Sequence, residues 1–138
     1  MLLFLLAAMA SQPLQLHIEH AGLHDRPVPK LVLYASGSPR EFPLPGDCPK
    51  AALCIPVEPA SWNVMVADAE SGLRQAAAPR DPGALGTFRF RLLGGTQPLE
   101  QVISPRQSSE LLLKLAKPAP TALRAELERR AALSEPRQ

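Results

Sequence analysis

The chain reads as an all-β protein, a single antiparallel β-sandwich of about six or seven strands with a short C-terminal helix. Two observations predict this class. Several short segments alternate apolar and polar residues, the period-two pattern of a strand with one buried face. The 138 residues also contain 16 prolines, more than twice the usual share, which favours short strands and rigid turns over long helices.

The N-terminus carries a targeting signal in this interpretation. Residues 1–10 are apolar and end in Ala8-Met9-Ala10, the small-x-small pattern that signal peptidase cleaves. The run is too short to cross a bilayer, which takes about 20 apolar residues. We therefore expect a signal peptide over 1–10, a β-sandwich over 11–117 and a helical tail over 118–138, in a periplasmic or secreted protein. The alternative is a first buried strand, because no basic residue precedes Arg26.

The first half of the sandwich begins with a hairpin. Residues 14–20 place Leu14, Leu16 and Ile18 on one face, and the apolar run within 28–35 predicts a second strand that pairs with the first. Residues 36–59 are rich in Pro and Gly and predict an irregular connection. One short apolar run, 51–57, interrupts it, and Pro56 restricts that run to a sheet edge or a bulge.

The second half contains the clearest alternation. Residues 62–68 predict a strand with Trp62, Val64 and Val66 on one face, and 76–86 predict a loop. Residues 87–92 predict a strand with Phe88, Phe90 and Leu92 inward, and 100–103 a short edge strand. Residues 108–116 suit either a helix or a strand, and the flanking Pro105 and Pro118 limit them to a length typical of strands. We predict a strand there, followed by a helix from Thr121 to about Leu133 that either docks or frays.

Three stretches of this sequence resemble the prealbumin-like and carboxypeptidase-regulatory-type β-sandwich domains. They are residues 24–33, with the Pro27-Val28 turn before a strand, residues 86–95, with a Gly-x-Phe-x-Phe strand, and residues 108–115, an apolar last strand. The resemblance implies an extracytoplasmic β-sandwich used for binding or as a scaffold. It carries no catalytic residues over to this chain.

The two cysteines fit an exported protein. Cys48 and Cys54 enclose five residues that can fold back and bring the two Cα atoms within disulfide range. We predict that they are bonded. A Cys-x-x-Cys redox motif has two intervening residues, and no second Cys or His pair has the spacing of a zinc finger, so both of these roles are disfavoured.

All three histidines, His17, His20 and His24, lie within eight residues and make a candidate copper or zinc site. On a strand, however, His17 and His20 point to opposite faces. We therefore predict no metal and no cofactor. Arg89 and Arg91 face outward on their strand, and we note them as a possible binding face, with an ordinary solvated surface as the alternative.

Charge and motif content narrow the function. A net charge of +2, from 15 basic and 13 acidic residues, gives no electrostatic basis for nucleic-acid binding. No serine lies in a Gly-x-Ser-x-Gly motif, and no histidine lies in a recognisable catalytic-triad context. The sequence thus predicts a small exported, non-enzymatic protein-binding or scaffold module, an adaptor, inhibitor or assembly component, whose partner is another protein. The alternative is a periplasmic metal-handling protein that uses the His17, His20 and His24 cluster.

Overall fold

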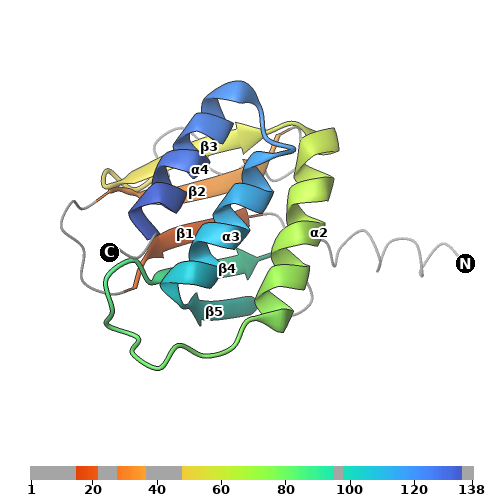
Figure 1. Ribbon diagram of the computed structural model, residues 1–138. Coiled ribbons are helices and arrows are strands. Elements are labelled where there is room, and N and C mark those ends of the chain that lie inside the picture. The colour runs from red at the N-terminus through yellow and green to blue at the C-terminus, as the bar shows by residue number, and fades with distance from the viewer. Residues whose placement is uncertain (1–14, 22–27, 37–47, 95–97, 135–138) are drawn as a thin grey trace, which may run out of the picture.

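A computed structural model of the chain describes residues 15–21, 28–36, 48–94 and 98–134. These residues form a mixed α/β fold with one five-stranded sheet and three helices, and 43% of them are helical. The predicted all-β sandwich is therefore wrong. Figure 1 shows the three helices lying together on one face of the sheet. The predicted signal peptide, 1–10, and His24 lie outside the described residues.

The sheet has the strand order β3-β2-β1-β4-β5. Its strands are β1 Gln15–His20, β2 Lys30–Ala35, β3 Ala52–Val57, β4 Phe88–Leu93 and β5 Leu99–Ile103. The β2–β3 pair is parallel and the other three pairs are antiparallel. The predicted hairpin of the first two strands is confirmed, and so are the edge positions of the strands containing Pro56 and residues 100–103.

Helix α2, Pro59–Gln75, replaces the strand predicted over 62–68. Its buried residues are Trp62, Met65, Ala69 and Leu73, which recur every three or four positions. This is the period of one helix face. Val64, which the strand pattern turned inward with Trp62, is 49% exposed. Pro59 stands in the first turn of α2, where its missing N–H costs no hydrogen bond.

Helix α3, Pro105–Ala116, replaces the strand predicted over 108–116. Ser104 caps its N-terminus by accepting a hydrogen bond from the Gln107 N–H, and Pro105 occupies the first turn. A strand would bury Leu111 and Leu113 together, whereas the helix buries Leu111, Leu112 and Leu115 and leaves Leu113 42% exposed. The two prolines therefore mark the ends of a helix and not the limits of a strand.

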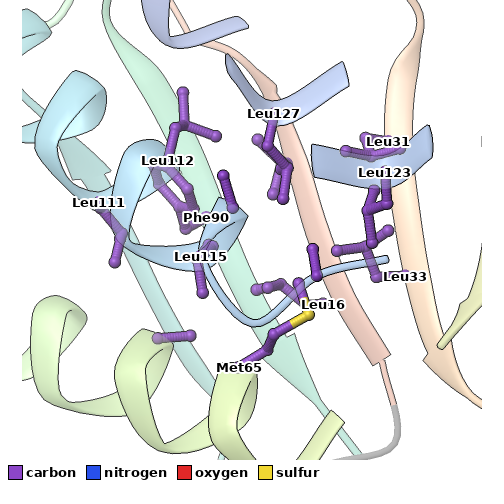
Figure 2. Close-up of a cluster of buried hydrophobic side chains, with 14 of the residues drawn as sticks. Leu16, Leu31, Leu33, Met65, Phe90, Leu111, Leu112, Leu115, Leu123 and Leu127 are labelled. Atoms are coloured by element: carbon purple, nitrogen blue, oxygen red, sulfur yellow. The ribbon is translucent and has the colours of Figure 1, made fainter. Parts of the chain in front are cut away.

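Helix α4, Thr121–Ser134, confirms the predicted C-terminal helix. It docks and does not fray, because its buried Leu123, Leu127 and Ala131 join the same core as the sheet. In Figure 2, Leu123 and Leu127 of α4 approach Leu31 and Leu33 of β2. Arg124 also donates hydrogen bonds to the carbonyl oxygens of Ala116, Lys117 and Ala119, which satisfies the exposed end of α3 and ties the two helices together.

The core lies between the sheet and the helix layer. Phe88, Phe90 and Leu92 of β4 point into it and are at most 3% exposed, as the alternation predicted. Leu16 and Ile18 lie beside them on β1, and Met65 of α2 and Leu112 of α3 close the core on the helix side. The helices therefore cover the apolar side of the sheet. The candidate binding surfaces are its other side and its edges.

Candidate functional site

The sheet has a polar face on the side away from the helices. Successive strand residues point to opposite sides, so the register places the polar residues of neighbouring strands in cross-strand rows. We call this surface the ladder face. Its central members are Gln15, His17, Glu19, Lys30, Arg89, Arg91, Glu100 and Val102. Val32, in the same row as His17, is only 1% exposed. No helix in the described ranges covers it (Figure 1).

Four charges on the ladder face pair across the strands. Arg89 of β4 lies between two carboxylates, at 3.7 Å from Glu19 on β1 and 3.4 Å from Glu100 on β5. Arg91 lies 3.6 Å from the second oxygen of Glu100. These distances are those of ion pairs and exceed the usual length of a charge-assisted hydrogen bond. Arg89 and Arg91, the predicted binding face, are thus partly exposed and held in place by their acidic neighbours.

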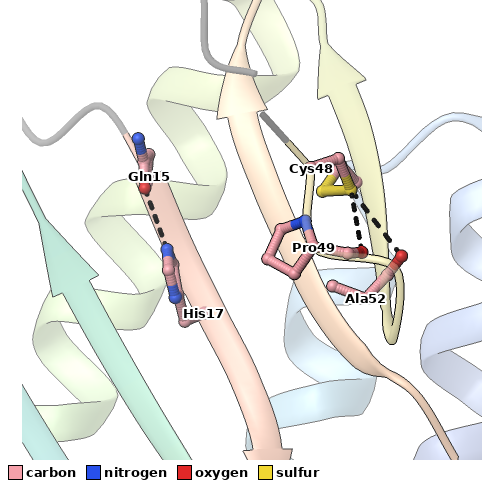
Figure 3. The surroundings of a disulfide bond; sticks show 6 residues. Gln15, His17, Cys48, Pro49 and Ala52 are labelled. Atoms are coloured by element: carbon pink, nitrogen blue, oxygen red, sulfur yellow. Dashed lines mark hydrogen bonds between the residues drawn. A yellow bond between two sulfur atoms is a disulfide. The ribbon is translucent and has the colours of Figure 1, made fainter. Parts of the chain in front are cut away.

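His17 sits at the centre of the ladder face and is neutral at physiological pH. Its Nε2 donates a hydrogen bond to the Gln15 side-chain oxygen at 2.9 Å, as Figure 3 shows. Burial, together with the charges of Lys30 and Arg91, lowers its pKa from 6.5 to about 4. In this state Nδ1 is buried and has no hydrogen-bond partner in the part of the chain that the structure describes. A charged imidazole here would add a third cation beside Lys30 and Arg91.

His20 does not join His17, and His24 lies outside the described residues. His20 pairs in register with Phe88 and stacks on that ring at 4.5 Å, on the helix side of the sheet. His17 lies opposite Arg91 on the ladder face, so the two histidines are on opposite faces, as strand geometry predicts. Within the described ranges no group of three His, Cys, Asp or Glu side chains is arranged to hold a metal ion.

The disulfide lies at the edge of the sheet opposite β5, on strand β3. Cys48 and Cys54 are joined, with Cα atoms 6.2 Å apart, as predicted. Cys54 is opposite Val32 in the register, and Figure 3 shows the turn of Cys48 and Pro49 folded back beside β2 and β3. A main-chain hydrogen bond from Ala52 to Pro49 completes the turn. The bridge thus ties the edge strand β3 to the turn that precedes it.

A groove opens between α2 and α3 beside β5. It has a volume of about 220 Å³ and combines an apolar floor with a polar rim. The floor is made by Gly72, Ala76, Ile103 and Leu111, and the rim by Gln75, Gln107, Glu110 and Lys114. A Cβ atom on Gly72 would lie 2.8 Å from the Leu111 Cδ1 atom, so glycine allows the two helices to approach here. The sequence did not predict this groove, because the groove lies between α2 and α3, which were both expected to be strands.

A buried arginine is the second feature that the sequence analysis missed. Arg130 of α4 is fully buried. Its Nε donates to Glu126 at 2.9 Å, while its two terminal nitrogens have no hydrogen-bond partner among the described residues. Burial lowers the pKa of Arg130 against the opposing effect of Glu126. The only sequence feature that points to this pair is the four-residue spacing from Glu126 to Arg130, and exposed helices show the same spacing.

Comparison with known proteins gives no relative. No family model, no curated protein and no solved structure matches the chain. None of the helices in the described ranges is long and apolar enough to cross a bilayer. The proposal for function therefore depends on the surfaces of this chain alone.

Proposed function

We propose that the chain is a small exported, non-enzymatic protein-binding or scaffold module. The observation that carries the proposal is the ladder face, where Glu19, Arg89, Arg91 and Glu100 are held in fixed register with no helix of the described ranges over them. A rigid pattern of alternating charges on a sheet is suited to selecting a protein surface with the opposite pattern. The partner is another protein, which the chain serves as adaptor, inhibitor or assembly component.

The disulfide supports the compartment. Bonds between cysteines persist in the periplasm and outside the cell, where thiols are not kept reduced. Cys48 and Cys54 are the two cysteines of the sequence, and they are joined. The proposed location is periplasmic or secreted.

Intact mass tests the compartment directly. Expressed with its own first residues in an exporting host, the protein should lose about ten N-terminal residues, as signal peptides of this type do. It should also contain no thiol that reacts with an alkylating reagent before reduction. Retention of Met1 in the extracytoplasmic fraction, or two reactive thiols, would contradict the proposed location.

Site-specific photo-crosslinking tests the binding role. A photoreactive phenylalanine analogue at position 91 would lie on the ladder face, and the same analogue at position 106 would lie on α3, where the Arg106 side chain is 86% exposed. In the native cell envelope we expect a discrete adduct from position 91 and not from position 106. Adducts of equal yield from both positions, or from neither, would count against a partner on this face.

A further inference from the structure

The outer edge of β5 offers unpaired main-chain groups. Ala21 donates its N–H to the Thr87 carbonyl, so the main chain of residue 87 faces β1, and the groups of Phe88 face β5 by strand alternation. In the β4–β5 register, Phe88, Phe90 and Leu92 then bond to Ile103, Gln101 and Leu99. The N–H and C=O groups of Glu100 and Val102 consequently point away from β4. They make no hydrogen bond to any part of the chain that the structure describes.

This edge lacks two of the usual protections against a further strand. Natural edges are commonly blocked by lysine, by proline or by a covering loop. The five residues of β5 include neither lysine nor proline. The connection 76–87 is drawn below β5 in Figure 1, but its main-chain hydrogen bonds join Ala84 to Asp81 and Thr87 to Ala84 within the loop, and Thr87 to Ala21 after β1. It does not pair with the strand.

Two surfaces flank the edge and specify what can pair with it. On the helix side, Ile103 at the end of β5 forms part of the floor of the α2–α3 groove, which has room for one apolar side chain. On the ladder face, Glu100 is half-exposed and follows Arg91 across the strands. The next position in that row would therefore favour a cation, because opposite charges on adjacent strands attract.

We propose that the edge of β5 binds an extended segment of a partner protein as a sixth, antiparallel strand. The residue opposite Ile103 places an apolar side chain in the α2–α3 groove, and the residue opposite Glu100 is lysine or arginine. In an antiparallel strand these two are three positions apart, with the apolar residue first. The inference rests on the proposed function, since it names the binding mode and the partner chemistry of the protein-binding module.

A second copy of this chain fits the edge less well. A two-fold axis at Gln101 would pair Leu99 with Ile103 and would satisfy the main chain. It would also place Glu100 opposite Val102, and β5 contains no basic residue that could pair with Glu100 instead. The charge pattern therefore favours a different protein over self-association.

Peptide binding to the full oxidised chain tests the proposal. The probe is a fluorescein-labelled ten-residue peptide with Leu-Thr-Thr-Lys-Val at its centre, and the order-reversed peptide is the control for strand direction. We expect the probe to bind with saturable anisotropy and the reversed peptide to bind more weakly. Failure of the probe to bind at millimolar concentration, or tighter binding of the reversed peptide, would contradict the proposed strand.

Two variants locate the binding on the edge. Val102→Pro removes an outward N–H and should weaken the probe at least about tenfold, the effect of one lost hydrogen bond together with steric block. Val102→Ala keeps the N–H and should bind within about twofold of the wild type. Glu100→Gln should weaken the lysine probe about threefold and leave a glutamine-substituted probe unchanged. Equal binding by both Val102 variants would place the peptide elsewhere.

Two further experiments distinguish self-association of the chain from binding of a partner away from the β5 edge. A wild-type dimer in sedimentation that Val102→Pro abolishes would identify a second copy as the occupant and overturn the proposal. If Val102→Pro leaves the position-91 adduct in the cell envelope unchanged, the partner binds away from the edge. The inference then fails while the proposed function stands, whereas absence of any adduct in the wild type removes the proposed function itself.

Discussion

The two edges of the sheet differ in whether a further strand can pair with them. At β3, Pro56 has no main-chain N–H to offer, and the Cys48–Cys54 bridge fastens the turn that leads into the strand. At β5, neither device is present, the groups of Glu100 and Val102 point outward, and a groove opens at Ile103. A protein that protects one edge and leaves the other open directs any added strand to a single side, which is the arrangement that a binding module needs.

The largest effect should come from the core that both edges share. Phe90 is fully buried in the middle of the sheet, and Phe90→Ala should cost about 3–5 kcal/mol of unfolding free energy. Arg91→Ala, on the adjacent residue of the ladder face, should cost about 0.5 kcal/mol or less. Urea denaturation measures both, and the reverse order would mean that the β4 register is shifted by one residue.

Proline substitutions separate the inner from the outer side of β5. Gln101→Pro removes an N–H that bonds to β4 and should cost about 2–3 kcal/mol, since it leaves a carbonyl of Phe90 unpaired. Val102→Pro removes an outward N–H and should cost less than about 1 kcal/mol. The same denaturation experiment compares them. Equal costs would show that Val102 is already paired and that the edge is not open.

Removal of the disulfide should affect the β3 edge alone. The ring is short, so replacing Cys48 and Cys54 by serine should cost about 2 kcal/mol, by the chain-entropy relation. Hydrogen exchange should accelerate in residues 52–57 and stay unchanged in residues 99–103 under conditions where the variant remains folded. Faster exchange at both edges would show that the bridge stabilises the whole sheet and not one border.

The smallest effect concerns His17, midway between the edges. Because its pKa is about 4 in the folded chain and 6.5 as the reference value, the unfolded chain binds more protons between these pH values. Stability therefore falls as the pH decreases from 7 to 5, by about 1 kcal/mol after allowance for solvent screening. His17→Gln should remove this contribution. An NMR titration that gives His17 a pKa near 6.5 would contradict the burial that underlies it.

Strands β1 and β4 could be read from the sequence because each shows its own alternation. Phe88 and Phe90 alternate with Arg89 and Arg91, and Leu16 and Ile18 alternate with His17 and Glu19, so one buried face is visible within six residues. The predicted disulfide followed from the short spacing of Cys48 and Cys54. The C-terminal helix was recognisable because its apolar residues recur every four positions between charged ones.

The helices α2 and α3 were misread because prolines have two meanings. The high proline content favours short strands over long helices, yet Pro59 and Pro105 each occupy the first turn of a helix, where proline is favoured. Three successive leucines at 111–113 fit either period, and only the packing partners decide. The α2–α3 groove could not be predicted, since it needs both helices, the close approach at Gly72 and the end of β5 at Ile103.

Amide hydrogen exchange across β5, resolved by NMR, tests the open edge most directly. In the free protein the amides of Glu100 and Val102 should exchange almost as fast as in an unfolded chain, while the amide of Gln101, bonded to β4, should be protected. Addition of the leucine–lysine probe peptide should slow Glu100 and Val102 and leave Gln101 unchanged. Equal protection of all three amides in the free protein would contradict an open edge.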